Sequence, residues 1–395
     1  MIIWLKRNLF RSVGDSIISV AVAALSGWVI WQLLQFIFIT GRWEIIQVNL
    51  KLLLVGRFPE ELMWMLGASI LALSFWIGAV ASSSKRDLNN KTSLIKTGFG
   101  LLSRFGLIIA LGAIIIALAG NLDAVLLGIG TVAAIALGRL VGLARRKIAV
   151  LAKIPWLVWQ ILLVALPLVM IIQTLLVSDL SEWGGFLINV YIAILSIALA
   201  FPLGVFLALG RRSSLPIVRL VCTSYIELVR GAPLFVLLLL AGVALEFFIP
   251  SEIAPGAIFR AVTVFTMFTA AYLAEIIRGG LQSISKGQTE AGKALGLSTV
   301  KIIFLITLPQ ALRNVIPAQI GQFISLFKDT TLAGAALSML ELLKVGEAIT
   351  KQDDYLGQGL VYESLGFVAL LFWVGSYVMS RESQRLERKL GVGIR

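Results

Sequence analysis

The stretch Glu290-Ala-Gly-Lys-Ala-Leu-Gly296, followed after nine residues by Ile306-Thr-Leu-Pro309, decides how the rest of the chain is interpreted. Within it, Ala291, Ala294 and Leu295 recur at i, i+3 and i+4, which predicts a short helix with one apolar stripe. The stretch lies between two long apolar runs. A loop between membrane spans needs only polar residues, so the stripe indicates a partner outside the bilayer.

The residues around this stretch predict where its helices begin and end. Ser285, with Gln288 three residues later, suits the start of the first helix. Gly296 can adopt the left-handed conformation that ends a helix, and Ser298 can begin the next one. The segment is therefore predicted to form a helix, a break and a second helix.

Composition places the chain in the membrane. Hydrophobic residues make up 59% of the 395 residues and charged residues 14%, compared with about 45–50% and about 25% in soluble domains. A helix needs about 20 apolar residues to cross the hydrocarbon. We predict an all-α integral membrane protein with about ten transmembrane helices, near Ser16–Ile39, Leu62–Val80, Phe99–Ala119, Ala124–Leu143, Pro155–Val177, Phe186–Leu209, Ala232–Ile249, Ala257–Ile277, Val315–Leu337 and Ser364–Met379.

The distribution of Lys and Arg predicts the orientation. Cationic loops are retained in the cytoplasm, and an orientation with both termini inside places most basic groups there, among them Lys85, Arg86, Arg211 and Arg212. The same orientation puts residues 290–309 in the cytoplasm. The net charge of +13 is then explained by topology and by anionic lipid headgroups, and not by nucleic-acid binding.

Two residue counts exclude several kinds of chemistry. Cys222 is the only cysteine, and the chain has no histidine. An internal disulfide and histidine-based catalysis are therefore excluded, and a zinc site is not expected. We expect no metal site and no catalytic residues.

Four motifs occur in a fixed order between Gly185 and about Arg388. They are 225–234, reading Tyr-Ile-Glu-Leu-Val-Arg-Gly-Ala-Pro-Leu, then 271–280, reading Ala-Tyr-Leu-Ala-Glu-Ile-Ile-Arg-Gly-Gly, then the 290–309 stretch, and 327–332, reading Phe-Lys-Asp-Thr-Thr-Leu. Together they resemble the histidine/glutamine-type family of ABC importer permeases for polar amino acids. In that family the cytoplasmic coupling loop reads Glu-Ala-Ala, whereas Gly292 stands here in place of the second Ala. Ten spans further resemble the extended M-type subunit of general L-amino-acid transporters.

The resemblance implies an architecture and a set of partners. Residues 181–395 would form the type I permease core of five helices, and residues 1–180 an N-terminal extension of about five more. The chain would be the permease subunit, not an enzyme, of an ATP-driven importer in the bacterial inner membrane. It would assemble with an ABC ATPase dimer that binds ATP and Mg²⁺, with a second, different permease chain, and with an extracytoplasmic substrate-binding protein that delivers the amino acid. The residues implied to dock the ATPase are Glu290, Ala291, Gly292, Ala294, Leu295, Gly296 and Leu297.

Charged residues near the ends of the seventh and eighth predicted spans suggest a gate. Glu227 and Arg230 are three residues apart, as are Glu275 and Arg278, so each pair can meet on one helical face. Ionisable groups at this depth usually face a cavity or one another. Two interpretations remain open: an inner gate that rearranges during transport, and simple ion pairing at the membrane interface.

The ninth predicted span is the most polar. Hydrogen-bonding groups within a membrane need partners, and lining a substrate path between two permease chains would supply them. Packing within the chain is the alternative. The candidate path residues are Gln319, Gln322, Ser325, Lys328, Asp329 and Thr330.

One motif points elsewhere. Residues 287–294 fit Gly, four residues, Gly-Lys, the start of a phosphate-binding loop, but Ala294 stands where Ser or Thr would bind magnesium. We therefore expect no ATP site in this chain. A secondary amino-acid transporter driven by an ion gradient is the alternative function; such proteins usually have two related halves, and the N-terminal half lacks any counterpart of residues 290–309.

Overall fold

The computed structural model describes residues 9–82, 122–147, 156–250 and 254–391, and within these ranges the chain is helical, with two isolated β-bridges and no strands. The N-terminal half contains α2 (Val13–Gln35), η1 (Phe36–Thr40), α3 (Glu44–Val48), α4 (Leu50–Val55), η2 (Glu60–Leu62), α5 (Met63–Ser82), α7 (Leu122–Lys147), α9 (Trp156–Val177) and η4 (Leu180–Glu182). The C-terminal half contains α10 (Gly185–Arg211), α11 (Pro216–Gly231), α12 (Leu234–Leu239), η5 (Leu240–Ala244), α13 (Leu245–Phe248), α14 (Ala257–Gln282), α15 (Lys286–Ala294), α16 (Thr299–Ile302), η6 (Ile303–Thr307), α17 (Leu308–Asn314), α18 (Ile316–Asp329), α19 (Leu332–Leu337), α20 (Leu342–Ile349) and α21 (Val361–Leu390). The predicted all-α fold class is confirmed.

The described helices agree with most of the predicted spans. Six are long and apolar enough to cross a membrane, or up to eight if each of two bent pairs counts as one span. The first, second, fourth, sixth, eighth and tenth predicted runs each fall on one of these six helices. The fifth falls on α9, which contributes a shorter apolar helix, Ile161–Val177. The third predicted run, 99–119, lies outside the described residues.

The seventh predicted run is helical from Leu234 to Phe248. The ninth was predicted as one continuous span, and this prediction was wrong. The seventh joins a longer unit in which Pro216–Gly231 and Leu234–Ala244 meet at 101°. Ala232 and Pro233 are extended there, because proline has no backbone N–H for a helix and disfavours helical geometry in the residue before it. Thr299–Asn314 meets Ile316–Asp329 at 62° where the ninth run begins, and within that run α18 ends at Asp329 before the separate helix α19 begins.

The core is organised around the contact of α10 with α14. The buried side of α10 has small residues at a spacing of four, including Ser196, Ala200 and Gly204. A Cβ on Gly204 would lie 2.8 Å from Leu273 Cβ of α14, so the two backbones approach closely, as small residues permit in membrane helices.

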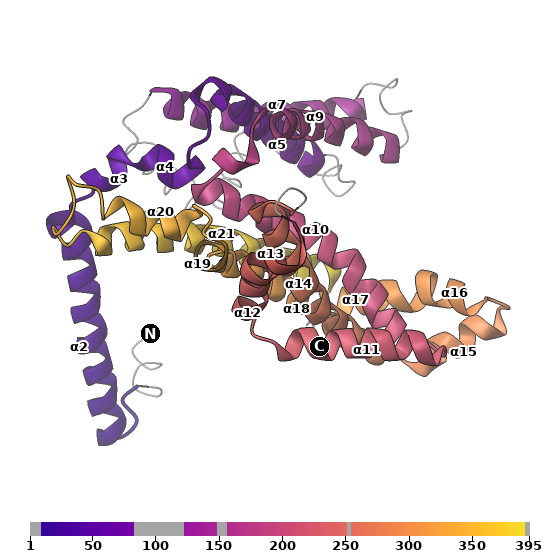
Figure 1. Cartoon of the computed structure of the whole chain (residues 1–395). Coiled ribbons are helices and arrows are strands. Elements are labelled where there is room, and N and C mark those ends of the chain that lie inside the picture. Colours follow the sequence, from indigo (N-terminus) through magenta and orange to yellow (C-terminus); the bar gives the residue numbers. More distant parts are fainter. Residues whose placement is uncertain (1–8, 83–121, 148–155, 251–253, 392–395) are drawn as a thin grey trace.

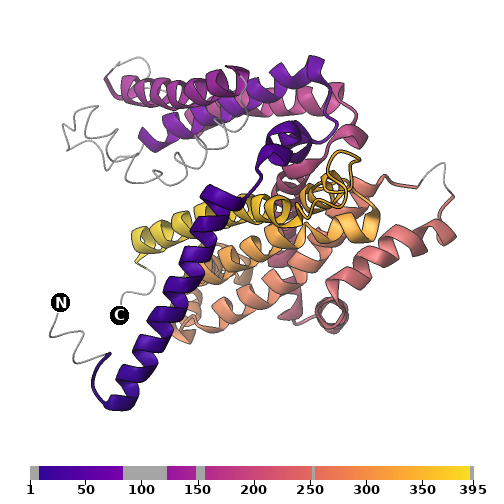
Figure 2. The same ribbon diagram turned by 90° about the vertical axis from the view of Figure 1, so that its left-hand side faces the viewer.

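Helices α5, α7 and α9 form a group of their own, which lies above the rest in both views (Figure 1; Figure 2). A Cβ on Gly78 of α5 would clash with the Ile135 carbonyl oxygen, and one on Gly138 of α7 would clash with the carbonyl oxygen of Phe75. These glycines let α5 and α7 pack backbone to backbone. By contrast α2 extends away from the rest (Figure 1) and contains no buried residue.

The segment between α2 and α5 is packed onto the C-terminal half. Ile45, Ile46 and Leu53 are fully buried in a cluster that includes Leu342 and Val345 of α20. The side-chain amides of Asn49 and Gln352 bond to each other in both directions, with N···O distances of 3.3 and 2.9 Å. This segment is thus a structural part of the core.

Truncating this contact should destabilise the protein. Ile46→Ala removes a fully buried side chain and is expected to cost about 2–5 kcal/mol through lost burial and a residual cavity. Val48→Ala is the control, because Val48 is 67% exposed on the same helix. Thermal unfolding in detergent should show a lower midpoint for Ile46→Ala only; equal midpoints would contradict the packing.

Candidate functional site

The helix, break and helix predicted at residues 285–309 are present. Gly296 has a φ of +74°. Two backbone hydrogen bonds end α15: Gly296 N–H donates to Lys293 O at 2.9 Å, and Leu297 N–H donates to Gly292 O at 3.1 Å. This pair of bonds is the Schellman arrangement, in which a left-handed glycine satisfies the last carbonyls of a helix. Ser298 then caps α16 by accepting from Lys301 N–H at 3.4 Å.

The start of α15 differs in detail from the prediction. Ser285 Oγ accepts from Gly287 N–H at 3.3 Å, whereas the side chain of Gln288 accepts from the amide of Gln310 on α17, also at 3.3 Å. The Gln288 side chain therefore links α15 to α17 and takes no part in a capping box.

The apolar stripe of α15 is exposed to solvent. Ala291, Ala294 and Leu295 are all exposed, and Leu295 retains 79% of its accessible surface. On the opposite side Gly292 is buried, and a Cβ there would lie 2.9 Å from Ile302 Cγ1. Glycine at position 292 thus lets α15 lie close against α16, which leaves the stripe facing outward. Glu290 is exposed and Leu297 half-buried.

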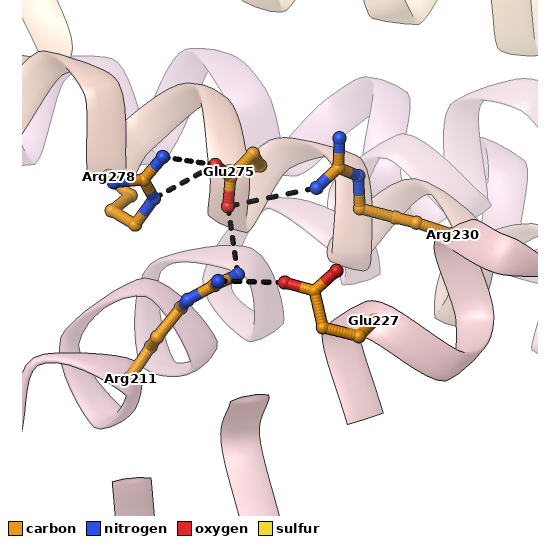
Figure 3. A network of polar contacts seen from close by, with 5 residues as sticks. All are labelled: Arg211, Glu227, Arg230, Glu275 and Arg278. Atoms are coloured by element: carbon orange, nitrogen blue, oxygen red, sulfur yellow. Dashed lines mark hydrogen bonds and ion pairs between the residues drawn. The ribbon is translucent and has the colours of Figure 1, made fainter. Parts of the chain in front are cut away.

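The charged residues at the ends of α10, α11 and α14 form one network (Figure 3). Arg211 donates to Glu275 at 3.0 Å and to Glu227 at 2.7 Å. Arg278 pairs with Glu275 within α14, as the spacing predicts. Arg230, however, does not pair with Glu227 as predicted: its nearest carboxylate oxygen belongs to Glu275, at 3.8 Å.

Arg211 is the member that sequence reasoning missed. It lies at the last turn of α10, 16 residues from Glu227 and 64 from Glu275, so no helical spacing connects it to them. Only the packing of α10 against α11 and α14 brings the three charges together. The sequence does place an arginine just beyond the end of a predicted span, but we interpreted it only as an indicator of membrane orientation.

The polar residues of the ninth predicted run do not share one environment. Gln319 is buried and its amide nitrogen has no hydrogen-bond partner. Gln322, Ser325 and Asp329 are half-buried and Lys328 is exposed. A predicted common stripe of Gln319, Gln322 and Ser325 is therefore only partly accessible.

Thr330 belongs to a buried hydrogen-bond network. Asn189 of α10 donates to Thr330 Oγ1 at 2.9 Å and to Glu341 Oε2 at 3.2 Å. The carboxylate of Glu341 also accepts from the N–H groups of Leu343 and Lys344 at the start of α20. Burial raises the pKa of Glu341, and these hydrogen bonds partly oppose the rise. Asn189 thus links α10, Thr330 and the start of α20, and sequence reasoning did not assign this structural role to Thr330.

The resemblance to a phosphate-binding loop has no structural basis here. Residues 286–294 are helical, so their backbone amides do not form the loop that cradles phosphates. In the described part of the chain, no group of three or more His, Cys, Asp or Glu could hold a metal ion.

These features define a class: a multi-pass helical membrane protein with a bent helical element exposed beside a charged helix junction. A family model described as the inner membrane component of binding-protein-dependent transport systems matches residues 200–391. A probable glutamine ABC transporter permease protein of Bacillus subtilis is 36% identical over 206 residues, which cover 52% of this chain and 91% of that protein. The chain therefore belongs to the family of binding-protein-dependent transport system inner membrane components.

Other relatives are longer than the matched region. A permease protein of a glutamate/glutamine/aspartate/asparagine transport system from Rhodobacter capsulatus is 43% identical over 212 residues, which cover 54% of this chain and 48% of that protein. An inner membrane amino-acid ABC transporter permease protein of Escherichia coli is 39% identical over 215 residues and is covered to 58%. The chain thus spans about half the length of these two relatives. A solved amino acid ABC transporter with histidines matches 52% of this chain and 92% of its own at 29% identity, with a TM-score of 0.47.

The charged junction should contribute measurably to stability. In a double-mutant cycle with Arg211→Gln and Glu275→Gln, we expect a coupling energy of about 0.5–3 kcal/mol, because the pair is partly buried and shares a network. The control pair is Lys344 and Glu347, which are 3.9 Å apart and nearly half exposed and should show almost no coupling. Thermal unfolding in detergent measures both cycles; equal coupling in the two pairs would contradict a structural junction.

Proposed function

We propose that this chain is the permease subunit of an ATP-driven ABC importer that takes up polar L-amino acids by alternating access. The observation that carries the proposal is the exposed apolar stripe of α15, held at a fixed angle by the turn at Gly296. An apolar surface in a polar loop between membrane helices loses water on contact with a partner, and family membership indicates that this partner is the ATPase.

The proposed assembly has four kinds of subunit. A dimer of ATPase subunits binds ATP and Mg²⁺ and docks on residues 290–297, so the present chain needs no ATP site and performs no catalysis. A second permease chain completes the path. A substrate-binding protein delivers the amino acid on the extracytoplasmic side. The relatives named as amino-acid permeases support this substrate class.

In the proposed orientation both termini and residues 285–309 are cytoplasmic, and the chain lies in the bacterial inner membrane. The junction of Glu227, Arg230, Glu275 and Arg278 with Arg211 is then the inner gate. Three helix ends meet there, so a rigid-body motion passed on from α15 separates or joins them. The polar residues of α18, among them Gln319 and Gln322, line the route that leads to this gate.

The first test uses the conformation of Gly296. Its φ of +74° strains any β-branched residue, although a Cβ there would meet no atom within 4 Å. Holding valine in this left-handed conformation costs roughly 1–3 kcal/mol, so the turn should change its geometry. Gly296→Val should therefore leave membrane insertion intact but lower amino-acid uptake per ATP hydrolysed. Gly296→Asn is the matched control, since asparagine tolerates the left-handed region. Proteoliposomes of the assembled complex give both rates.

Normal coupling in Gly296→Val would count heavily against this assignment. Uptake by the purified chain alone, under a proton or sodium gradient and without ATPase subunits, would favour the secondary transporter instead.

A second test concerns the path. Gln319→Leu removes a buried amide whose nitrogen has no hydrogen-bond partner, a defect that costs about 1–3 kcal/mol, so thermal stability should be unchanged or higher while uptake falls. Ile320→Leu, a change of similar volume on the same helix, should leave both unchanged. Undiminished uptake by Gln319→Leu would remove this residue from the proposed path.

A further inference from the structure

Arg230 is the least satisfied cation of the charged junction. Its contact with Glu275 measures 3.8 Å, too long for a hydrogen bond. Its Nε is buried and has no hydrogen-bond partner. In Figure 3 one terminal nitrogen of Arg230 approaches Glu275 and the other points away from both carboxylates. A guanidinium has five N–H donors in a fixed plane, and within the described part of the chain none of those on Arg230 makes a hydrogen bond.

The junction also carries an excess of positive charge. Three guanidinium groups, those of Arg211, Arg230 and Arg278, face the two carboxylates of Glu227 and Glu275. Arg211 and Arg278 hold these carboxylates with short contacts. The remaining positive charge therefore resides mainly on Arg230, whose side chain is 33% exposed and so accessible to a small solute.

The surroundings of Arg230 orient its guanidinium. The carbon of this group lies 5.4 Å from the centre of the Tyr272 ring on α14, and an aromatic face at that distance attracts a cation. Arg230 is also the penultimate residue of α11, next to the 101° bend into α12. A group bound to Arg230 would thus contact the point where the two helices change direction.

We propose that Arg230, supported by Tyr272, is a binding site for a carboxylate group, and that its ligand is the α-carboxylate of an amino acid leaving through the gate. Arginine matches carboxylates by two parallel N–H···O bonds, and one carboxylate would balance the excess charge. The identity of the ligand rests on the proposed function; the carboxylate chemistry rests on the junction itself. Glu275 keeps its bonds to Arg211 and Arg278 when Arg230 turns to the ligand, so the junction loses only its longest contact.

The test measures protection of Arg230 from the arginine reagent phenylglyoxal. The full-length chain in lipid nanodiscs, with and without its co-expressed ATPase and second permease chain, is treated in the presence of L-glutamine, L-glutaminamide, acetate or inorganic phosphate. Mass spectrometry follows modification of Arg230 and of Arg212, an exposed arginine outside the network. L-Glutaminamide keeps the side chain and ammonium of L-glutamine and lacks only the α-carboxylate.

Acetate and L-glutamine should slow modification of Arg230 about threefold at twice their dissociation constants, and L-glutaminamide should not. Arg212 should react at the same rate throughout. Equal protection by L-glutaminamide, protection by phosphate without acetate, or no protection would each overturn the carboxylate site. Protection by acetate without L-glutamine would keep the carboxylate chemistry and overturn the amino-acid ligand.

Two variants complete the test. Tyr272→Leu removes the ring that orients the guanidinium and should weaken protection, whereas Tyr272→Phe keeps the ring and should preserve it. Uptake by the wild-type assembled complex is measured in parallel. Absence of any amino-acid uptake would defeat the proposed function, while the acetate experiment would still decide whether Arg230 binds carboxylates.

Discussion

The close contact of α10 with α14 is the interaction on which the rest of the C-terminal half depends. In a membrane the lipid is as apolar as the side chains, so helices associate through tight packing and polar contacts. Gly204 and the alanines around it let the two helices meet at backbone distance. This pairing fixes one end of α10, with Arg211, beside Glu275 of α14, and the other end, with Asn189, beside Glu341.

The two ends of α10 are stabilised by different kinds of polar network. At the Asn189 end every group is buried, and the network closes on the backbone of α20. A fully satisfied network of this kind favours one arrangement. At the Arg211 end the groups are partly exposed and one cation is left over. Exposed ion pairs of that kind contribute less to stability, which is compatible with the gate proposed for this junction.

The sequence was a good guide wherever the determining contacts are local. The Schellman turn at Gly296, the exposed stripe of α15 and the pairing of Glu275 with Arg278 all involve residues within five positions of one another. It was a poor guide to distant contacts: Arg211 belongs to the junction because two long helices pack, and Thr330 is buried because Asn189, 141 residues away, bonds to it. The break between α18 and α19 was missed because Thr330 and Thr331 give no direct signal that a helix ends.

Gly296 has a consequence for how such a chain can change. The turn between α15 and α16 depends on a left-handed residue whose missing side chain would touch nothing. The residues proposed to meet a partner are others, on the exposed side of α15. The residue that shapes the turn is therefore distinct from the exposed residues of α15, so substitutions on the exposed side can alter the proposed docking surface without changing the turn.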